Sequence, residues 1–294
     1  MNIVKRFKSN RNEYDYTLIG SGAFGKVYRS FNQIDNNVYA IKKTPVTKDS
    51  VKYALQEIRI LSQLYHPNIV RYFNSWAERG TIEDDNDINS TAIIKNNHGN
   101  GYYLHLQMEY CKIDLKQLLE MRKELNLQQS KNIFNQILCG IEYIHEKGII
   151  HRDLKPANIL ITENNIVKIS DFGLGKVLSN NTINTECTTY TGTELYASPE
   201  QFNGESYSYS TDIYSLGIIL FELVNLFTTT MERIIEIKNL KDGKQMTVPI
   251  ILSMVNKEPE LRPTAKILKQ MFCEEHISTY IICRDIVWGI IANF

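Results

Sequence analysis

The chain has 294 residues, of which 43% are hydrophobic and 22% are charged, as in ordinary globular proteins. Its 33 basic and 33 acidic side chains cancel, so the chain has no excess of positive charge to hold nucleic acid, and no direct nucleic-acid binding is predicted. The five cysteines stand far apart without a Cys-x-x-Cys pair. This pattern argues against a disulfide framework or a zinc site and favours a reducing compartment.

The ends of the chain carry no membrane signal. Residues 1–11 are basic and polar, unlike a secretory signal peptide. Residues 281–294 are apolar, but Arg284 and Asp285 interrupt them and the run is too short to span a bilayer. We therefore expect a cytoplasmic protein that does not associate with membranes.

The first predicted elements are strands. Residues 14–43 combine apolar and alternating stretches with a glycine-rich turn, which predicts three strands. Residues 49–65 carry apolar side chains three and four positions apart, which predicts a helix. Pro67 ends this helix because proline has no amide hydrogen for the helical ladder. A further strand is expected at residues 69–76.

The pattern changes beyond that strand. Residues 81–101 begin with acidic side chains and end in an Asn/Gly cluster, so little of this stretch can be buried and we expect a mobile insertion. Residues 102–110 predict another strand. Long helices then follow, notably at residues 128–147, 212–227 and 264–271. A mostly-strand part therefore precedes a mostly-helical part.

A glycine-rich stretch runs from Gly20 through Gly22 to Gly25. Without side chains, its backbone can approach phosphates and offer them N–H groups. Such turns are equally common between ordinary strands, so this motif alone decides nothing. Lys42 closes a strand 17 residues beyond Gly25. A lone lysine there is more often a solvated edge residue, but Glu57 on the next helix can hold it and aim its charge at phosphates.

The most specific segment runs from His151 to Asn158 and places a carboxylate, a lysine and an amide within six residues of loop. Asp153 can accept the proton of a substrate hydroxyl, and Asn158 can ligate a metal ion. Asp171, in Asp-Phe-Gly, adds the kind of oxygen ligand that magnesium prefers. Any one carboxylate can equally be a cap or a surface charge, but the ordered set is far more specific.

This ordered set resembles the eukaryotic protein kinase superfamily over nearly the whole chain. The resemblance implies an α+β bilobal kinase fold over residues 14–272, with an ATP cleft between a small mostly-β N-lobe and a larger mostly-α C-lobe. The implied divisions are residues 14–110 for the N-lobe with its insertion at 81–101, 111–272 for the C-lobe, 1–13 for an N-terminal extension and 273–294 for a C-terminal tail.

The resemblance implies ATP and Mg²⁺ as cofactors. The ATP-binding positions that it implies are Gly20, Ser21, Gly22, Ala23, Phe24, Gly25, Val27, Ala40, Lys42, Glu57, Met108, Glu109 and Cys111. Met108 would lie at the back of the adenine pocket, although plain core packing explains it equally well. The implied catalytic residues are Asp153, Lys155 and Thr193, and the implied metal ligands are Asn158 and Asp171. In this family, a lysine at position 155 is typical of serine/threonine kinases.

The family also implies structural roles at the end of the activation segment. Glu200, in Ser-Pro-Glu, would pair with Arg262, and Asp212 would anchor the backbone of the catalytic loop. Phosphorylation inside the activation segment is expected at Thr188, with Thr189 as the alternative.

A narrower resemblance is to the kinases of eukaryotic translation initiation factor 2 alpha. It is carried by residues 68–78, 106–111, 192–201 and 230–233, and by the insertion. It implies that this factor is the substrate, that translation falls under stress, and that the factor docks around Thr229, Thr230, Glu232 and Arg233. For any single docking residue, a surface helix cap is an equal alternative. The departures are Ala197 for the commoner methionine, Gly175 for the usual alanine, and a short insertion.

Two alternatives to this function remain at the level of sequence. One is a serine/threonine kinase of another substrate, such as a mitotic kinase. The other is a catalytically dead mimic, against which the intact Lys42, Asp153, Asn158 and Asp171 argue. The resemblance also implies a weak homodimer through the N-lobe, where Arg6, Arg11 and Glu13 occupy the preceding region without a clean alignment.

Overall fold

The computed structural model describes residues 14–22, 25–47, 50–80, 101–177, 194–203, 208–245 and 247–273. They fall into two compact units. The first unit takes in the chain up to Tyr65 and again Val70–Cys111, and the second takes in His66–Ile69 and the chain from Lys112 onward. The main division therefore lies one residue beyond the expected boundary, and a four-residue stretch of the expected N-lobe belongs to the second unit.

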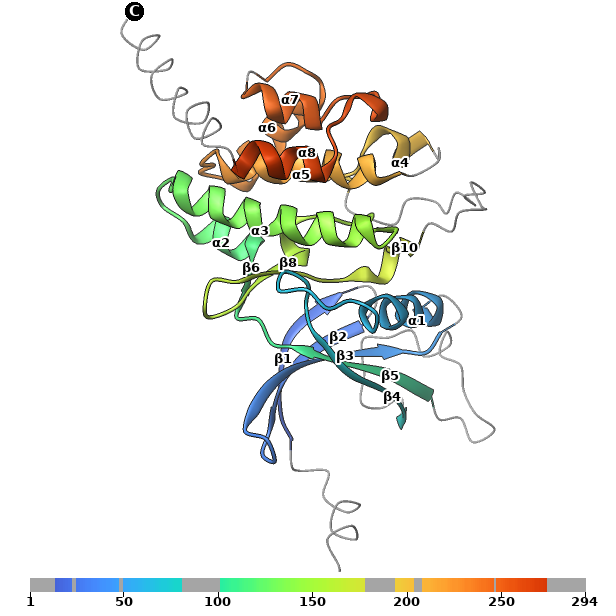
Figure 1. The fold of residues 1–294 in the computed structure, drawn as a ribbon. Helices are drawn as coiled ribbons and strands as arrows, with labels where there is room; N and C mark the ends of the chain where they lie inside the picture. The colour runs from blue at the N-terminus through green and yellow to red at the C-terminus, as the bar shows by residue number, and fades with distance from the viewer. Residues whose placement is uncertain are drawn as a thin grey trace, which may run out of the picture. The chain divides into compact units, whose positions relative to one another are not determined.

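An antiparallel sheet forms the body of the first unit, with its five strands in the order β1-β2-β3-β5-β4 (Figure 1). The strands are β1 (Tyr14–Gly22), β2 (Gly25–Asn32), β3 (Asn37–Pro45), β4 (Tyr72–Gly80) and β5 (Gly101–Glu109). The three strands predicted in residues 14–43 are thus confirmed. Gly101, the last residue of the expected insertion, already belongs to β5, and residues 81–100 lie outside the described part of the chain.

The strand predicted at residues 69–76 begins only at Tyr72, and residues 66–69 belong to the second unit. Ile69 forms a single parallel bridge with Ile169. The carbonyl oxygen of Asn68 accepts a hydrogen bond from the Ile169 amide at 2.9 Å, and the Asn68 side chain donates to the Val167 carbonyl oxygen at 3.0 Å. These contacts hold residues 66–69 in the second unit.

The helix of the first unit, α1 (Ser50–Leu61), ends four residues before its predicted end. Its buried face includes Ala54, Ile60 and Leu61, as the apolar spacing predicts. Glu57 lies on the same face and is 3% exposed. A carboxylate buried among apolar side chains needs a compensating partner, so this position is the first sign of a functional group in the helix.

Helices dominate the second unit (Figure 1). They are α2 (Leu115–Met121), α3 (Leu127–Glu146), α4 (Pro199–Asn203), α5 (Tyr209–Leu223), α6 (Thr230–Lys241), α7 (Pro249–Met254) and α8 (Ala265–Cys273). The three long helices that the sequence predicts correspond to α3, α5 and α8, with shifted ends. Helix α5 is buried almost throughout, and Phe134 of α3 packs against Phe272 of α8 at 4.9 Å between ring centroids.

Close packing in this unit depends on a glycine. A Cβ on Gly217 of α5 would lie 2.7 Å from Val255 Cγ1 and 2.9 Å from Met254 Cβ. Contacts that short do not occur between carbon atoms, so α7 approaches α5 only because this residue has no side chain.

The segments between the helices of the second unit contain short strands and single 3-10 turns. The strands are β6 (Ile113–Asp114), β7 (Ile149–Ile150), β8 (Ile159–Ile161), β9 (Val167–Ile169) and β10 (Lys176–Val177). They form a β6-β8-β9 sheet and a β7-β10 pair. The 3-10 turns are η3 (Pro156–Asn158), η4 (Phe172–Leu174) and η5 (Pro259–Leu261). In the described part of the chain, no helix has both the length and the apolar character needed to cross a membrane.

Candidate active site

The glycine-rich motif closes the β1–β2 hairpin, where Gly22 pairs with Gly25. Gly25 has a φ of 137°, and a Cβ there would lie 2.3 Å from the carbonyl oxygen of Lys43. This backbone position therefore requires glycine. The two residues at the tip, Ala23 and Phe24, lie outside the described residues.

Lys42 and Glu57 form the ion pair that the sequence predicts. Lys42 Nζ, on β3, lies 2.7 Å from Glu57 Oε2, on α1. The two side chains are only 12% and 4% exposed. Removing either partner would leave a charge buried without its counterion, which is costly. The pair holds the ammonium of Lys42 at a fixed place on the sheet.

The other predicted nucleotide-binding residues of this unit lie on the sheet or at its end. Ala40 of β3 pairs with Met108 of β5, and both side chains are buried. Glu109 ends β5, where its amide donates to the carbonyl oxygen of Arg71 at 2.9 Å. The rest are Gly20 and Ser21 on β1, Val27 on β2, and Cys111, which follows β5. The burial of Met108 agrees with either of its two sequence interpretations.

Asp153 is the centre of a polar cluster in the loop between β7 and η3. Its Oδ2 accepts hydrogen bonds from Lys155 Nζ at 2.7 Å and from Asn158 Nδ2 at 3.1 Å. Asn158 Nδ2 also donates to the Asp153 carbonyl oxygen at 2.8 Å. The three residues that the sequence singles out in this loop therefore contact one another, and Asp153 is held by both neighbours.

Asp212 fastens the backbone of this loop from α5, as predicted. Its two carboxylate oxygens accept the amides of His151 and Arg152, each at 2.9 Å, and His145 Nε2 lies 2.8 Å from Oδ2. Arg152 has a φ of 70°, a left-handed conformation that is unfavourable for a non-glycine residue and needs such support. Burial opposes the charge of Asp212, but the hydrogen bonds and charges of His145 and His151 outweigh it and lower its pKa.

The two predicted metal ligands are joined through His151 and Ser170. His151 Nε2 lies 2.8 Å from the Ser170 carbonyl oxygen, and the Ser170 amide donates to the Asn158 carbonyl oxygen at 2.9 Å. Asp171 follows directly, with a φ of 63°. The buried ring of Phe172 packs on His151 at 4.8 Å between centroids. Asn158 and Asp171 are thus held by a shared set of buried contacts.

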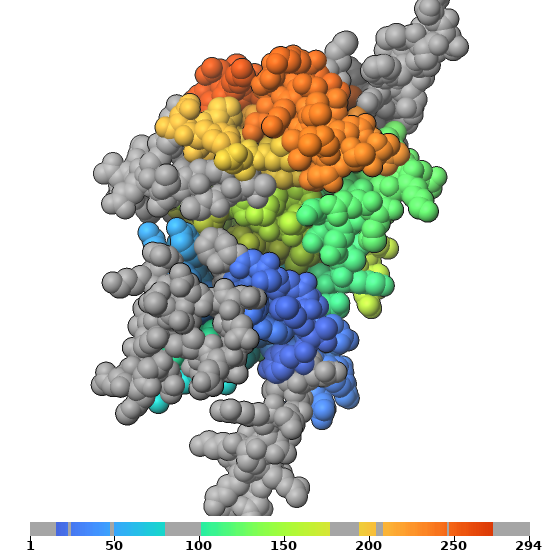
Figure 2. Space-filling model, turned by 180° about the vertical axis from the view of Figure 1, so that it is seen from behind, coloured from blue at the N-terminus to red at the C-terminus, as the bar shows by residue number. Residues whose placement is uncertain are grey.

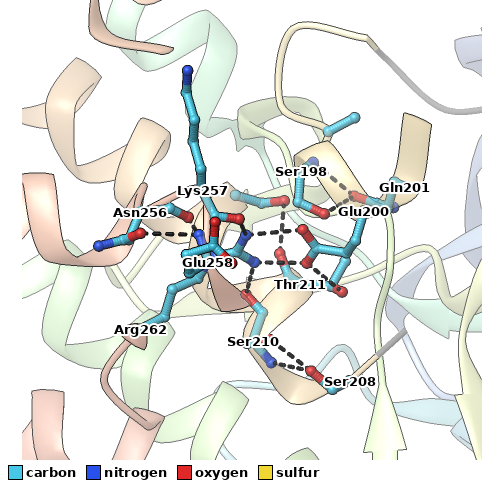
Figure 3. A network of polar contacts seen from close by, with 12 residues as sticks. Ser198, Glu200, Gln201, Ser208, Ser210, Thr211, Asn256, Lys257, Glu258 and Arg262 are labelled. Atoms are coloured by element: carbon cyan, nitrogen blue, oxygen red, sulfur yellow. Dashed lines mark hydrogen bonds and ion pairs between the residues drawn. The ribbon is translucent and has the colours of Figure 1, made fainter. Parts of the chain in front are cut away.

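Glu200 and Arg262 form the predicted ion pair at the end of the activation segment (Figure 3). Both guanidinium NH groups bind the carboxylate, at 2.6 and 2.8 Å, and Thr211 Oγ1 donates to it at 3.1 Å. Arg262 also donates to the Ser210 carbonyl oxygen at 3.0 Å. Burial disfavours the charge on Glu200, but the hydrogen bonds from Arg262 outweigh it and hold its pKa below the ordinary value.

Residues predicted to dock a substrate lie at the start of α6, where the structure gives them local roles. Thr229 caps the helix by accepting the Glu232 amide at 3.1 Å, and Glu232 Oε2 accepts the Thr228 amide at 2.7 Å. Thr230 is the first helical residue. Arg233 Nη1 lies 2.9 Å from Glu222 Oε1, a fully buried carboxylate. The helix-cap alternative is therefore observed, and the guanidinium of Arg233 is engaged inside the unit.

Two contacts of this region were not predicted. Gln201 Nε2 donates to the Arg152 carbonyl oxygen at 3.0 Å, and Lys241 Nζ donates to three backbone carbonyl oxygens near the start of α4. Gln201 lies within residues 192–201, one of the stretches that carry the narrower resemblance, and that was the only signal for it in the sequence. Nothing in the sequence around Lys241 marks it, because its partners are more than 40 positions away.

Several predicted positions lie outside the described residues. They are Thr193 of the catalytic set, the phosphorylation candidates Thr188 and Thr189, and the N-terminal positions Arg6, Arg11 and Glu13.

The comparisons with known proteins identify the family of the chain. A family model described as protein kinase domain matches residues 14–277. The chain belongs to the protein kinase family, and its mixed α+β fold is the fold of that family.

Relatives within the family give a finer likeness. The chain is 37% identical over 279 residues to the interferon-induced, double-stranded RNA-activated protein kinase of Rattus norvegicus, covering 90% of this chain and 52% of that protein. It is 31% identical over 277 residues to the eIF-2-alpha kinase GCN2 of Arabidopsis thaliana, covering 82% and 22%. It is 32% identical over 288 residues to the serine/threonine-protein kinase Nek4 of Mus musculus, covering 90% and 33%. The chain spans about half, or less, of the length of these relatives.

Proposed function

We propose that the chain transfers the γ-phosphate of ATP to a serine of the alpha subunit of eukaryotic translation initiation factor 2, and so lowers translation under stress. The main support for kinase activity is the cluster in which Lys155 and Asn158 both bind the Asp153 carboxylate. A carboxylate held in this way has a fixed orientation, which phosphoryl transfer needs because it depends on positioning and charge neutralisation.

Each described residue of the cluster has a separate task in this proposal. Asp153 accepts a hydrogen bond from the acceptor hydroxyl and takes its proton as the new oxygen–phosphorus bond forms. The bond between the γ-phosphorus and the β–γ bridging oxygen breaks in the same transfer, and ADP leaves. Lys155, 2.7 Å from Asp153, is close enough to stabilise negative charge on the transferring phosphoryl group. Lys42 contributes a phosphate-binding charge from the first unit, and Glu57 fixes its position.

The residues present fit a magnesium ion. Asn158 Nδ2 is committed to Asp153, which leaves its amide oxygen as the atom offered to a cation. Asp171 adds a carboxylate, so the donor set consists of hard oxygens, which suits Mg²⁺. Among the described residues, no group of three or more His, Cys, Asp and Glu side chains is placed so that it could hold a metal ion. In this chemistry, the ion neutralises charge on the phosphates of ATP.

The choice of substrate rests on the relatives rather than on the geometry. Relatives in Arabidopsis thaliana and Schizosaccharomyces pombe are named eIF-2-alpha kinases, and the former is 31% identical to this chain. The similarity to Nek4, 32% over a comparable length, supports a second candidate. In that alternative, the chain phosphorylates serine or threonine in another protein. The cluster around Asp153 serves both substrates equally.

Phosphorylation of purified initiation factor 2 alpha tests the proposal. The wild-type chain should transfer labelled phosphate from ATP to the factor, and replacement of the factor's target serine by alanine should abolish the transfer. The variant D153N provides the control for contaminating kinases. Transfer to a generic basic protein, without transfer to the factor, would favour the second candidate. Absence of transfer to any protein would reject kinase activity and favour the catalytically dead mimic.

A further inference from the structure

Lys241, the last residue of α6, binds the chain just before α4. Its Nζ donates to the carbonyl oxygens of Glu194 at 3.1 Å, Leu195 at 3.4 Å and Ala197 at 3.1 Å. An ammonium group has three donors and no acceptor, so three carbonyl oxygens satisfy it completely. We call the bound stretch, residues 194–197, the carbonyl ledge.

The surroundings of Lys241 make this contact specific. Its Nζ lies 5.3 Å from the ring centroid of Phe202 and 5.8 Å from that of Tyr214, within the range of cation–π attraction. Burial lowers the pKa of Lys241, and the nearby charge of Glu194 opposes that shift. A half-buried ammonium loses hydration, so the carbonyl oxygens must replace the lost water.

A second attachment joins the other end of α6 to the same ledge. Tyr196 donates its hydroxyl to Glu222 Oε2 at 2.8 Å, and Arg233, in the first turn of α6, binds Glu222 Oε1 at 2.9 Å. The Tyr196 carbonyl oxygen also accepts from Ser215 Oγ of α5 at 2.9 Å. Both ends of α6 thus reach the ledge, one directly and one through a buried carboxylate.

The residues that follow the ledge contact the catalytic loop. The Ser198 amide donates to Gln201 Oε1 at 3.0 Å, and Gln201 Nε2 donates to the Arg152 carbonyl oxygen at 3.0 Å. Arg152 directly precedes Asp153. Figure 2 shows residues 194–203, in gold, side by side with the orange helix α6 on one face of the molecule. Hydrogen bonds, together with the peptide bond between Ala197 and Ser198, therefore connect α6 to Arg152, the residue before the proposed base.

We propose that Lys241 is a positioning residue for the protein acceptor: it fixes the carbonyl ledge, and the ledge, joined through Gln201 to the residue before Asp153, orients the acceptor toward that carboxylate. The ledge is joined to the catalytic loop through Ser198 and Gln201, so its conformation influences where an acceptor hydroxyl meets the carboxylate. This inference rests on the proposed function. It adds that α6 acts on catalysis through the ledge, for any protein acceptor.

The variant K241M tests the inference, because methionine keeps an apolar stem but has no donor and no charge. We expect kcat/KM for a protein acceptor to fall roughly tenfold, as for the loss of hydrogen bonds from a charged group. The loss should come mainly from a higher KM for the acceptor. The KM for ATP and the hydrolysis of ATP without acceptor should stay unchanged, and K241R should recover most of the loss because it restores the charge and the donors.

The matched control is K238M, on the same helix, because Lys238 is exposed. It should behave as the wild type. Hydrogen exchange provides a readout that does not need activity: amides of residues 194–203 should exchange faster in K241M and at the wild-type rate in K238M. If K241M does not fold, K241Q, which keeps the two N–H donors of an amide but no charge, replaces it in the same comparison with K238Q.

The outcomes separate the two proposals. Wild-type transfer to a generic basic protein but not to initiation factor 2 alpha would reject that substrate, while the effect of K241M on the basic protein would still decide the role of Lys241. If the wild type transfers phosphate to neither protein, the function is rejected, and with it the acceptor role of Lys241. Equal KM values and exchange rates in K241M and K238M would overturn the inference, as would a parallel loss of acceptor-free ATP hydrolysis.

Discussion

The guanidinium of Arg262 binds both carboxylate oxygens of Glu200, at 2.6 and 2.8 Å, and both side chains are almost completely buried. The pair joins the end of the activation segment to the turn before α8. Breaking a buried pair by removing one partner costs about 3–5 kcal/mol, because the other charge stays buried without its counterion.

We therefore expect E200A to lower the free energy of unfolding of the chain by about 3–5 kcal/mol in urea denaturation. The exposed pair between Lys244 and Asp242 provides the control, since D242A should leave the stability nearly unchanged. Similar losses in the two variants would contradict the importance of burial for the pair of Glu200 and Arg262.

Asp153 carries the second prediction. The variant D153N removes the proton acceptor but leaves an amide of nearly the same shape next to Lys155 and Asn158. It should lower kcat by about 10²–10⁴, with little change in the KM for ATP, as for a group that acts in the transition state. Steady-state kinetics on a protein acceptor measures both constants. A kcat equal to that of the wild type would show that another group takes the proton.

Lys42 carries the third prediction. The variant K42R keeps the positive charge beside Glu57, but a planar guanidinium cannot take the place of a compact ammonium that must reach both Glu57 and a phosphate. We expect phosphoryl transfer to be nearly abolished, while the melting temperature without ligand stays close to that of the wild type. Thermal melting with and without ATP and magnesium then reports nucleotide binding. Wild-type turnover in K42R would remove Lys42 from the mechanism.

Local sequence patterns predicted most of the site. The contacts among Asp153, Lys155 and Asn158 lie within six residues, so the spacing of residue types along the chain already restricts their geometry. The pair of Lys42 and Glu57 was predicted because the kinase template requires a strand lysine held by an acid on the following helix.

Contacts between distant segments could not be predicted in the same way. Gln201 binds Arg152 across 49 positions, and Lys241 reaches Glu194 across 47. Such contacts depend on how helices and loops pack, and local periodicity does not encode that. Arg233, which the sequence resemblance suggests as a docking residue, also binds the buried carboxylate of Glu222, and the local sequence pattern does not predict this contact.

Glu222 provides a prediction for pH. Burial raises its pKa to about 7, against the opposing influence of Arg233 and Tyr196. The folded state therefore holds a proton that the unfolded state, with an ordinary pKa near 4.5, has already released. The contribution of Glu222 to stability should fall as pH rises from about 4.5 to 7, by an amount on the order of 1–3 kcal/mol, and should stay level above pH 7.

Urea denaturation of the wild type and E222Q between pH 4.5 and 8 measures this contribution. Glutamine does not titrate, so the difference in stability between the two proteins isolates Glu222 from other carboxylates, such as Glu200 and Asp212, whose pKa values are lowered. The wild type should lose stability relative to E222Q as the pH rises. A difference that is independent of pH would contradict the raised pKa.

The last prediction separates docking from helix capping at Glu232. This carboxylate accepts hydrogen bonds from the Thr228 amide and hydroxyl, at 2.7 and 2.8 Å, and those bonds lower its pKa. The variant E232A removes both the charge and the cap, whereas E232Q keeps an acceptor oxygen for Thr228 and removes only the charge. If the charge contacts folded initiation factor 2 alpha, E232Q should raise the KM for the factor about fivefold and leave a generic basic protein unaffected. If Glu232 only caps α6, E232Q should match the wild type on both substrates, and only E232A should affect thermal stability. Equal losses on both substrates in E232Q would reject a docking role and place the effect in the carbonyl ledge that α6 holds.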